Sequence, residues 1–93
     1  MRTIRRSTRF KRDFKRELSG RFGLTLTAEL SALVSLLAND QPLPENFRDH
    51  ALSANWKGHR DCHVKPDLVL IYRLPDQSTL ELVRLGSHSE LKI

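Results

Sequence analysis

The stretch LVLIYRLPDQSTLELVRL, residues 68–85, decides the fold. Leu68–Leu74 is apolar and rich in strand-favouring residues, which is typical of a central strand covered on both faces. Pro75-Asp76-Gln77-Ser78 is typical of a turn, and Thr79–Leu85 returns as the next strand. The stretch therefore predicts an antiparallel hairpin at the centre of a sheet.

Shorter segments upstream extend this sheet. The side chains of His59–Val64 alternate in a way that predicts a strand. In such a strand His59, Asp61 and His63 lie on the uncovered face of the sheet, and Arg60, Cys62 and Val64 lie on the face toward the helices. Lys65-Pro66 then interrupts the ladder, because proline has no amide hydrogen to donate. Asp49–Leu52 is a candidate short strand. Trp56-Lys57-Gly58 is a candidate turn, with Trp56 as a buried anchor or, alternatively, as a platform that stacks on a base.

The first 40 residues follow a helical period instead. Phe10, Phe14 and Leu18 recur every four residues, which predicts an amphipathic helix from Thr8 that Gly20 or Gly23 ends in a left-handed conformation. A second helix is expected from Thr25–Thr27 to Asn39-Asp40, with an apolar stripe of Leu26, Leu30, Leu33, Val34 and Leu37. Arg2–Ser7, short and partly β-branched, is a candidate strand added to the sheet.

Helices followed by hairpin-linked strands predict an α+β fold. We expect two N-terminal helices packed on one face of a twisted, mainly antiparallel sheet, in one domain that spans residues 1–93. The longest wholly apolar run, Leu68–Tyr72, is too short to span a membrane, and no secretory signal is visible. The single cysteine, Cys62, fits a cytoplasmic location because it has no partner for a disulfide.

The net charge of +5 is unevenly distributed. Residues 1–21 hold nine basic and two acidic side chains, whereas the rest of the chain is nearly balanced. Such a basic segment indicates a polyanionic or acidic partner, although a solvated helix face would have the same composition. A DNA-recognition helix is disfavoured, since two helices followed by a sheet do not form a helix-turn-helix.

The second half of the chain contains all four histidines. Histidine exchanges a proton near neutral pH, and RNA carries its own nucleophile, the 2′-hydroxyl. RNA cleavage therefore needs only a base, an acid and cations, which the histidines (His50, His59, His63 and His88) and nearby Lys57, Arg60 and Arg84 would supply without a cofactor. The alternative is that these are exposed histidines at strand ends with no role in chemistry.

Metal binding is a weaker interpretation of the same residues. His59 and His63 would lie about 13 Å apart in a strand, whereas zinc bonds to histidine are about 2.0–2.1 Å long. With one cysteine and no paired ligand motif, we expect no metal site. Cys62 is expected to face inward as an inert core residue rather than to act as a nucleophile.

A collinear series of motifs covers about half the chain and resembles the YafQ branch of the RelE/ParE superfamily, the toxins of bacterial toxin–antitoxin pairs. The matching stretches are Pro42-Leu43-Pro44, Asp49-His50-Ala51-Leu52, Trp56-Lys57-Gly58, Arg60-Asp61-Cys62-His63-Val64, Pro66-Asp67, Leu70-Ile71-Tyr72-Arg73 and Arg84-Leu85-Gly86-Ser87-His88-Ser89-Glu90-Leu91.

The resemblance implies a microbial-RNase-like fold and metal-independent, ribosome-dependent cleavage of mRNA in the A site. It implies that His88 is the general acid, that His50 or His63 is the base or a phosphate ligand, and that Asp67 orients a histidine. The residues then expected to contact RNA are Lys57, His59, Arg60, Asp61 and Arg84.

The resemblance also implies partners. These are a cognate antitoxin whose acidic or amphipathic C-terminal segment covers the basic surface in a heterotetramer, and the 70S ribosome with its mRNA, but no membrane. Leu68 and Lys92 stand where relatives carry aromatic residues expected to contact RNA bases, so an inactive toxin remnant is one alternative. A ParE-like DNA gyrase inhibitor, which needs no histidines, is another.

Overall fold

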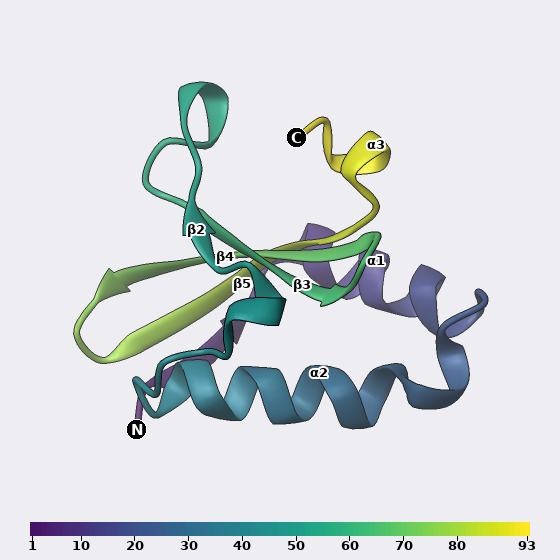
Figure 1. The fold of residues 1–93 in the computed structure, drawn as a ribbon. Helices are drawn as coiled ribbons and strands as arrows, with labels where there is room; N and C mark the ends of the chain where they lie inside the picture. Colours follow the sequence, from purple (N-terminus) through teal and green to yellow (C-terminus); the bar gives the residue numbers. More distant parts are fainter.

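A computed structural model describes all residues, 1–93, as helices packed against a sheet (Figure 1). Its elements in chain order are β1 (Thr3–Arg6), α1 (Thr8–Leu18), α2 (Gly23–Ala38), η1 (Glu45–Phe47), β2 (His50–Ala51), η2 (Ala54–Trp56), β3 (Arg60–Lys65), β4 (Leu68–Asp76), β5 (Thr79–Gly86) and α3 (His88–Leu91). None of these helices combines the length and apolar character that crossing a bilayer requires.

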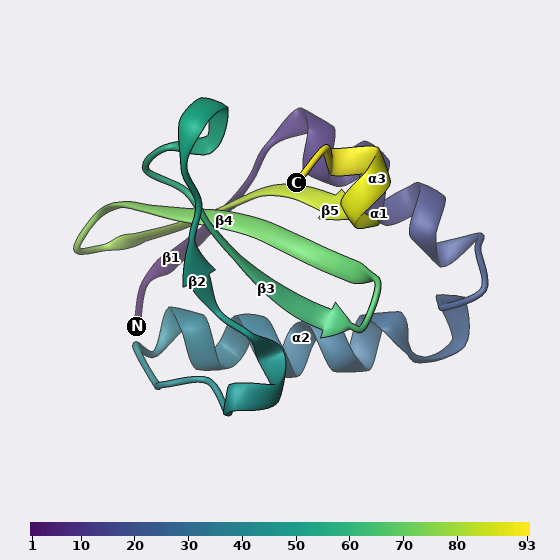
Figure 2. The same cartoon turned by 45° about the horizontal axis from the view of Figure 1, so that its top comes forward.

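The sheet has five strands in the order β1-β5-β4-β3-β2. Its four C-terminal strands pair antiparallel, whereas β1 joins the edge parallel to β5. The predicted central hairpin is therefore confirmed, as is the N-terminal strand. Figure 2 shows the twist of the sheet, with α2 below it and the C-terminal helix α3 on the other side.

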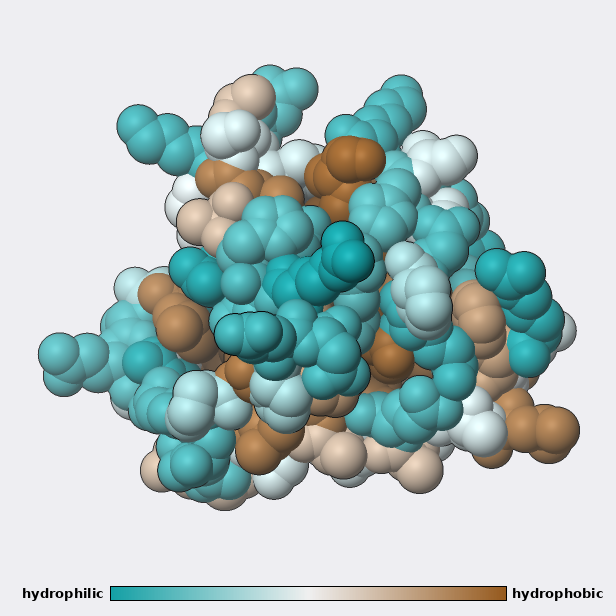
Figure 3. Space-filling model, viewed as in Figure 1, coloured by the Kyte–Doolittle hydropathy of each residue, from teal (hydrophilic) through white to brown (hydrophobic).

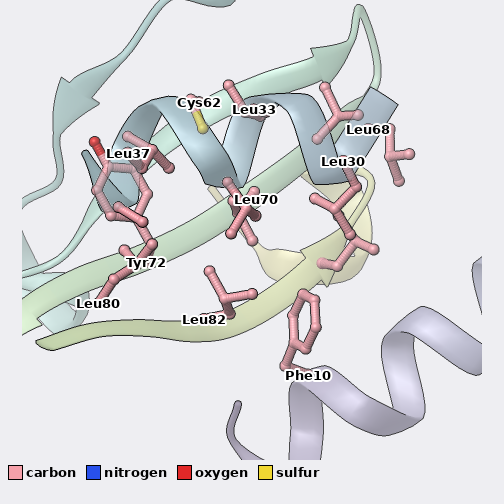
Figure 4. Packing of buried hydrophobic residues seen from close by; sticks show 14 of the residues in the cluster. Phe10, Leu30, Leu33, Leu37, Cys62, Leu68, Leu70, Tyr72, Leu80 and Leu82 are labelled. Atoms are coloured by element: carbon pink, nitrogen blue, oxygen red, sulfur yellow. The ribbon is translucent and has the colours of Figure 1, made fainter. Parts of the chain in front are cut away.

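The main core lies between the helices and one face of the sheet. Figure 4 shows the leucines of α2 facing Cys62, Leu70 and Tyr72, with Phe10 of α1 closing one end. Leu70 and Cys62 are fully buried and paired across β3 and β4, so the inward position predicted for Cys62 is confirmed. The predicted α+β arrangement, with both N-terminal helices on one face, follows from this packing.

The joint between the two helices differs from the prediction. Neither Gly20 nor Gly23 has a positive φ, and α2 begins at Gly23, before the expected Thr25. A Cβ atom at Gly23 would lie 2.1 Å from the Leu18 carbonyl oxygen. Glycine at this position therefore allows the end of α1 and the start of α2 to approach closely, and does not supply a left-handed cap.

Three strand boundaries also differ. β4 continues through Pro75 to Asp76, with a register shift between Arg73 and Asp76, and leaves only Gln77 and Ser78 in the turn. β3 begins at Arg60, so His59 precedes the strand and does not share a face with Asp61 and His63. Of the expected strand Asp49–Leu52, only His50 and Ala51 pair with β3. The sequence reasoning did not predict α3, although Ser87 and Glu90 form a capping box there.

A buried carboxylate joins α1 to the last strand. Asp13 is 3% exposed and accepts hydrogen bonds from the Leu85 amide (3.0 Å), Arg84 Nε (2.7 Å) and Arg16 Nη1 (3.0 Å). Burial alone would raise the pKa of Asp13, but the bonds from Arg84 and Leu85 and the two guanidinium charges lower it below its ordinary value. Asp13 is therefore ionised in the folded protein at neutral pH.

We expect Asp13→Asn to lower the free energy of unfolding by about 3 kcal/mol at pH 7, because it leaves Arg84 without its counter-charge. The pKa of Asp13 is lower in the folded than in the unfolded state, so this contribution is present above about pH 4 and is lost at more acidic pH. Urea unfolding measures both effects. Asp40→Asn, which removes the exposed partner of Arg2, is the control and should cost less than about 1 kcal/mol.

Candidate active site

Three histidines and two aspartates gather on the face of the sheet opposite α2. His50 lies on β2, His63 on β3, His88 at the start of α3, and Asp67 in the tight turn between β3 and β4. The rings of His63 and His88 contact each other edge to face, with centroids 4.9 Å apart. The structure therefore brings together the four residues expected to act in catalysis, which are separated by up to 38 positions in the sequence.

His88 is held on two sides. Ser87 caps α3 and Glu90 completes the capping box, which fixes the first turn of this short helix. Asp67 Oδ1 lies 2.9 Å from His88 Nδ1 and 3.3 Å from the His88 amide nitrogen. These hydrogen bonds from His88 lower the pKa of Asp67 below its ordinary value. Asp67 is therefore an ionised carboxylate that accepts a hydrogen bond from the Nδ1–H group of His88. Nε2 of His88 is then left free to exchange a proton.

His63 is half-buried on β3, opposite Val69 of β4. Burial lowers its pKa, and the neighbouring positive charges of His88, Arg48 and His50 lower it further, whereas Asp61 acts in the opposite sense. His63 is therefore neutral at pH 7 and able to accept a proton. Two adjacent histidines, one tied to a carboxylate and one kept neutral, have the arrangement of an acid and a base.

Asp61 lies beneath His50. It was predicted to be exposed on the uncovered face, but the structure buries it. It is 2% exposed, since β2 and β4 flank it and the histidines cover it. Its Oδ1 atom lies 3.1 Å from His50 Nδ1 but accepts no hydrogen bond, because that nitrogen is 2.7 Å from the Arg48 carbonyl oxygen. Burial raises the pKa of Asp61 despite the three histidines nearby.

A hollow of about 640 Å³ opens beside the His63–His88 pair. Arg48 forms part of its wall, makes no ion pair, and has a left-handed backbone with φ of 50°. The sequence reasoning missed Arg48. Its signal was a cation two positions before His50, on the segment that leads into the sheet. An exposed guanidinium next to two histidines is suited to binding a phosphate group.

The other residues expected to contact RNA lie apart from this hollow. Lys57 and His59 are in the loop before β3, where the His59 ring packs edge to face against Trp56. Arg60 lies on the helix side of β3 and pairs with Asp49, which also accepts a hydrogen bond from Tyr72. Arg84 pairs with Asp13. Lys57 forms no ion pair and is thus free for a ligand, whereas both arginines already have carboxylate partners.

No three histidine, cysteine, aspartate or glutamate side chains converge in a way that could hold a metal ion. Cys62 is fully buried on the opposite face of β3, and burial raises the pKa of its thiol well above the ordinary value. Its thiolate is therefore not available as a nucleophile at neutral pH. The acid–base groups of this face come from the histidines and aspartates.

The fold and the site together define a class: small α+β domains that carry acid–base side chains on the open face of a sheet. The family model described as "Bacterial toxin of type II toxin-antitoxin system, YafQ" matches residues 2–93. The chain belongs to this family and is a toxin of a type II toxin–antitoxin system.

Two relatives illustrate the similarity in sequence. The toxin YafQ of Haemophilus influenzae is 50% identical over 60 residues, 61% of this chain and 59% of that protein. The mRNA interferase toxin YafQ of Escherichia coli strain B is 47% identical over 64 residues, 68% of each chain. The matched segments therefore cover about three fifths to two thirds of these relatives.

Two solved structures extend the similarity to the whole chain. A copper-bound mutant toxin from Helicobacter pylori has a TM-score of 0.90 and 40% identity, over 98% of this chain and 99% of that one. YafQ in the DinJ–YafQ complex of E. coli has a TM-score of 0.79 and 37% identity, over 98% of both chains. The similarity in fold therefore covers 98% of this chain.

The two aspartates of the site should have opposite effects on stability. The pKa of Asp61 is raised in the folded state, so its ionisation opposes folding, and Asp61→Asn should leave the free energy of unfolding unchanged or higher at pH 7. The pKa of Asp67 is lowered, so Asp67→Asn should reduce stability above about pH 4. Relative to wild type, the stability of Asp61→Asn should increase as the pH rises above about 4, whereas that of Asp67→Asn should decrease as the pH rises toward about 4 and then stay lower.

Urea unfolding at several pH values measures these two differences. A loss of more than about 1 kcal/mol at pH 7 in Asp61→Asn would mean that attraction to His50 outweighs the cost of burying the carboxylate.

Proposed function

We propose that this toxin is an mRNA endoribonuclease that acts on ribosome-bound messages and thereby inhibits translation. The observation that carries the proposal is the contact between His63 and His88, beside an unpaired arginine and an open hollow. The E. coli relative named an mRNA interferase supports the same activity. The side chains of this site provide the acid, the base and the cation that the reaction needs.

In the proposed reaction His63 accepts the proton of a ribose 2′-hydroxyl, whose oxygen attacks the adjacent phosphorus. The bond from phosphorus to the 5′-oxygen breaks, and His88 gives its Nε2 proton to that leaving oxygen. The products are a 2′,3′-cyclic phosphate and a free 5′-hydroxyl. Asp67 holds His88 in the required orientation and compensates the charge of its doubly protonated ring.

Arg48 and His50 are placed to bind the phosphate that is attacked. Arg48 lines the hollow together with His63 and His88, and its charge opposes the charge that develops on the phosphorane oxygens. His50 lies over the buried Asp61, with its Nδ1 atom 3.1 Å from the carboxylate and 2.7 Å from the Arg48 carbonyl oxygen, whereas burial lowers the pKa of His63. His50 is therefore the better phosphate ligand and His63 the better base.

We also propose a cognate antitoxin as the partner of this toxin, as in the complex of E. coli YafQ with DinJ. The exposed face of α1 presents Lys11, Arg12 and Lys15, none of which forms an ion pair. An acidic or amphipathic segment would neutralise this face, and the same face would steer the free toxin to ribosomal RNA. Docking and chemistry therefore use different surfaces.

Replacing the general acid tests the chemistry. His88→Ala should reduce cleavage of ribosome-bound mRNA by roughly 10²–10⁴-fold, because protonation of the leaving oxygen is lost. Ser89→Ala, one residue further along α3, is the matched control and should keep the wild-type rate. Mapping of 5′ ends after induced expression measures the effect. Wild-type cleavage by His88→Ala would contradict the assignment, and intact messages accompanied by DNA damage signalling would favour gyrase inhibition.

Removing charge from α1 tests docking. Replacing Lys11, Arg12 and Lys15 with glutamine should weaken ribosome binding and lower the slope of log K against log salt by about 2–3. Cleavage of ribosome-bound mRNA at a saturating toxin concentration should be unchanged, since these residues lie away from the histidines. Ribosome sedimentation at several salt concentrations gives the slope. Equal binding by the variant and the wild type would exclude this docking face.

A further inference from the structure

A second hollow, of about 610 Å³, lies on the same face of the sheet but does not include the histidines. It opens between the loop around η2 and the C-terminal residues that follow α3. Its walls come from four separate segments of the chain: the start of α1, residues 52–56, β5, and residues 90–93. The mechanism proposed above makes no use of it.

The floor of this hollow is apolar. Trp56, Leu52 and Ile93 are only partly buried and rest on a small core cluster of Val69, Ile71 and Leu91. In Figure 3, apolar atoms reach the surface near the C-terminus among hydrophilic neighbours. Trp56 is packed against this cluster but is only partly buried, so it is not the buried anchor predicted first, and it lines the hollow. A flat, partly exposed indole is a platform on which a nucleobase stacks.

The rim carries uncompensated positive charge. Arg84 forms an ion pair with Asp13, and Glu90 forms one with Arg16. Glu90 also accepts a hydrogen bond from the Ser87 amide. Arg9 and Lys92 form no ion pair, so the hollow has a net positive charge. Arg9 belongs to the basic N-terminal segment, which the fold thus brings to the chemical face. Two free cations above an apolar floor match a nucleotide, with its flat base and its phosphate.

The backbone at both walls is unusual. Ala54 and Lys92 have positive φ angles of 53° and 58°, although neither is glycine or asparagine. Such conformations cost of order 1 kcal/mol or more each and persist where the surroundings impose them. Both residues line the hollow.

We propose that the second hollow binds a nucleotide of the RNA chain next to the bond that is cut. Its base stacks on Trp56, and Arg9 and Lys92 contact its phosphate. This proposal rests on the RNA cleavage proposed above. About one turn of α3, or 5–6 Å of helix, separates His88 from Leu91 and Lys92, so neighbouring nucleotides of one strand can reach both hollows.

Trp56 is the only tryptophan, so its fluorescence reports on this hollow alone. The probe is a four-nucleotide RNA with 2′-O-methyl groups, which cannot be cleaved because its nucleophile is blocked. We expect saturable quenching, with a Kd that increases about 3–10-fold in Arg9→Gln and in Lys92→Gln. Arg6→Gln is the matched control, since Arg6 is exposed and lies on the helix side of the sheet; its Kd should equal that of wild type.

The same probe with a fluorescent label measures binding without the tryptophan. Trp56→Leu should weaken binding at least 5-fold, as expected for loss of one stacked base. Circular dichroism and thermal unfolding check that this variant is folded. If Trp56→Leu is unfolded, the quenching series on the two cation variants still decides the question.

The proposal is overturned if the labelled RNA binds without quenching Trp56, or if Arg6→Gln weakens binding as much as Arg9→Gln. A failure of the proposed cleavage would appear elsewhere, as unchanged activity in His88→Ala. The two failures are therefore distinguishable.

Discussion

The buried carboxylate of Asp13 is the constraint on which the arrangement of this toxin depends. Asp13 fixes Arg84 and the Leu85 amide at the end of β5 and holds Arg16 on α1. Arg16 in turn donates to the Leu85 carbonyl and lies 3.4 Å from Glu90, the residue that completes the cap of α3. One ionic network therefore links the first helix to the short helix that presents His88. The network therefore connects the stability of the α1–β5 contact to the cap of the helix that carries His88.

The two aspartates on the open face of the sheet differ in their exposure to solvent, and this gives them different roles. Asp67 is exposed and hydrogen-bonded, so it stays charged and orients His88. Asp61 is buried without a hydrogen bond, and it acts on His50 through its charge alone. His63 lies between them and is kept neutral by burial. Three identical side chains thus differ in role because their surroundings differ: in the proposed reaction His88 is the acid, His63 the base and His50 a phosphate ligand.

Much of the fold could be predicted from local pattern. The helical period of Phe10, Phe14 and Leu18 and the hairpin of residues 68–85 depend on short-range spacing, and both are present. The burial of Asp61 depends on contacts between distant segments, which spacing does not encode. The close approach of Gly23 to Leu18 and the capping box of α3 are local, but helical and strand periodicity does not reveal them. Likewise, the sequence supplied the candidate histidines, but only the sheet order brings them together. Arg9 in the second hollow could not be anticipated, because helical periodicity does not tell which part of the sheet lies beside α1.

The central claim is that His63 and His88 form one coupled acid–base pair. The direct measurement is a pH titration of the His63 ring by NMR in wild type and in His88→Gln. The pKa of His63 is lowered in wild type by burial and then by the charge of His88. In the variant it should rise part of the way toward the ordinary histidine value, because burial remains and the like charge is gone. An unchanged pKa of His63 would show that the two rings do not interact, and the proposed mechanism would be wrong.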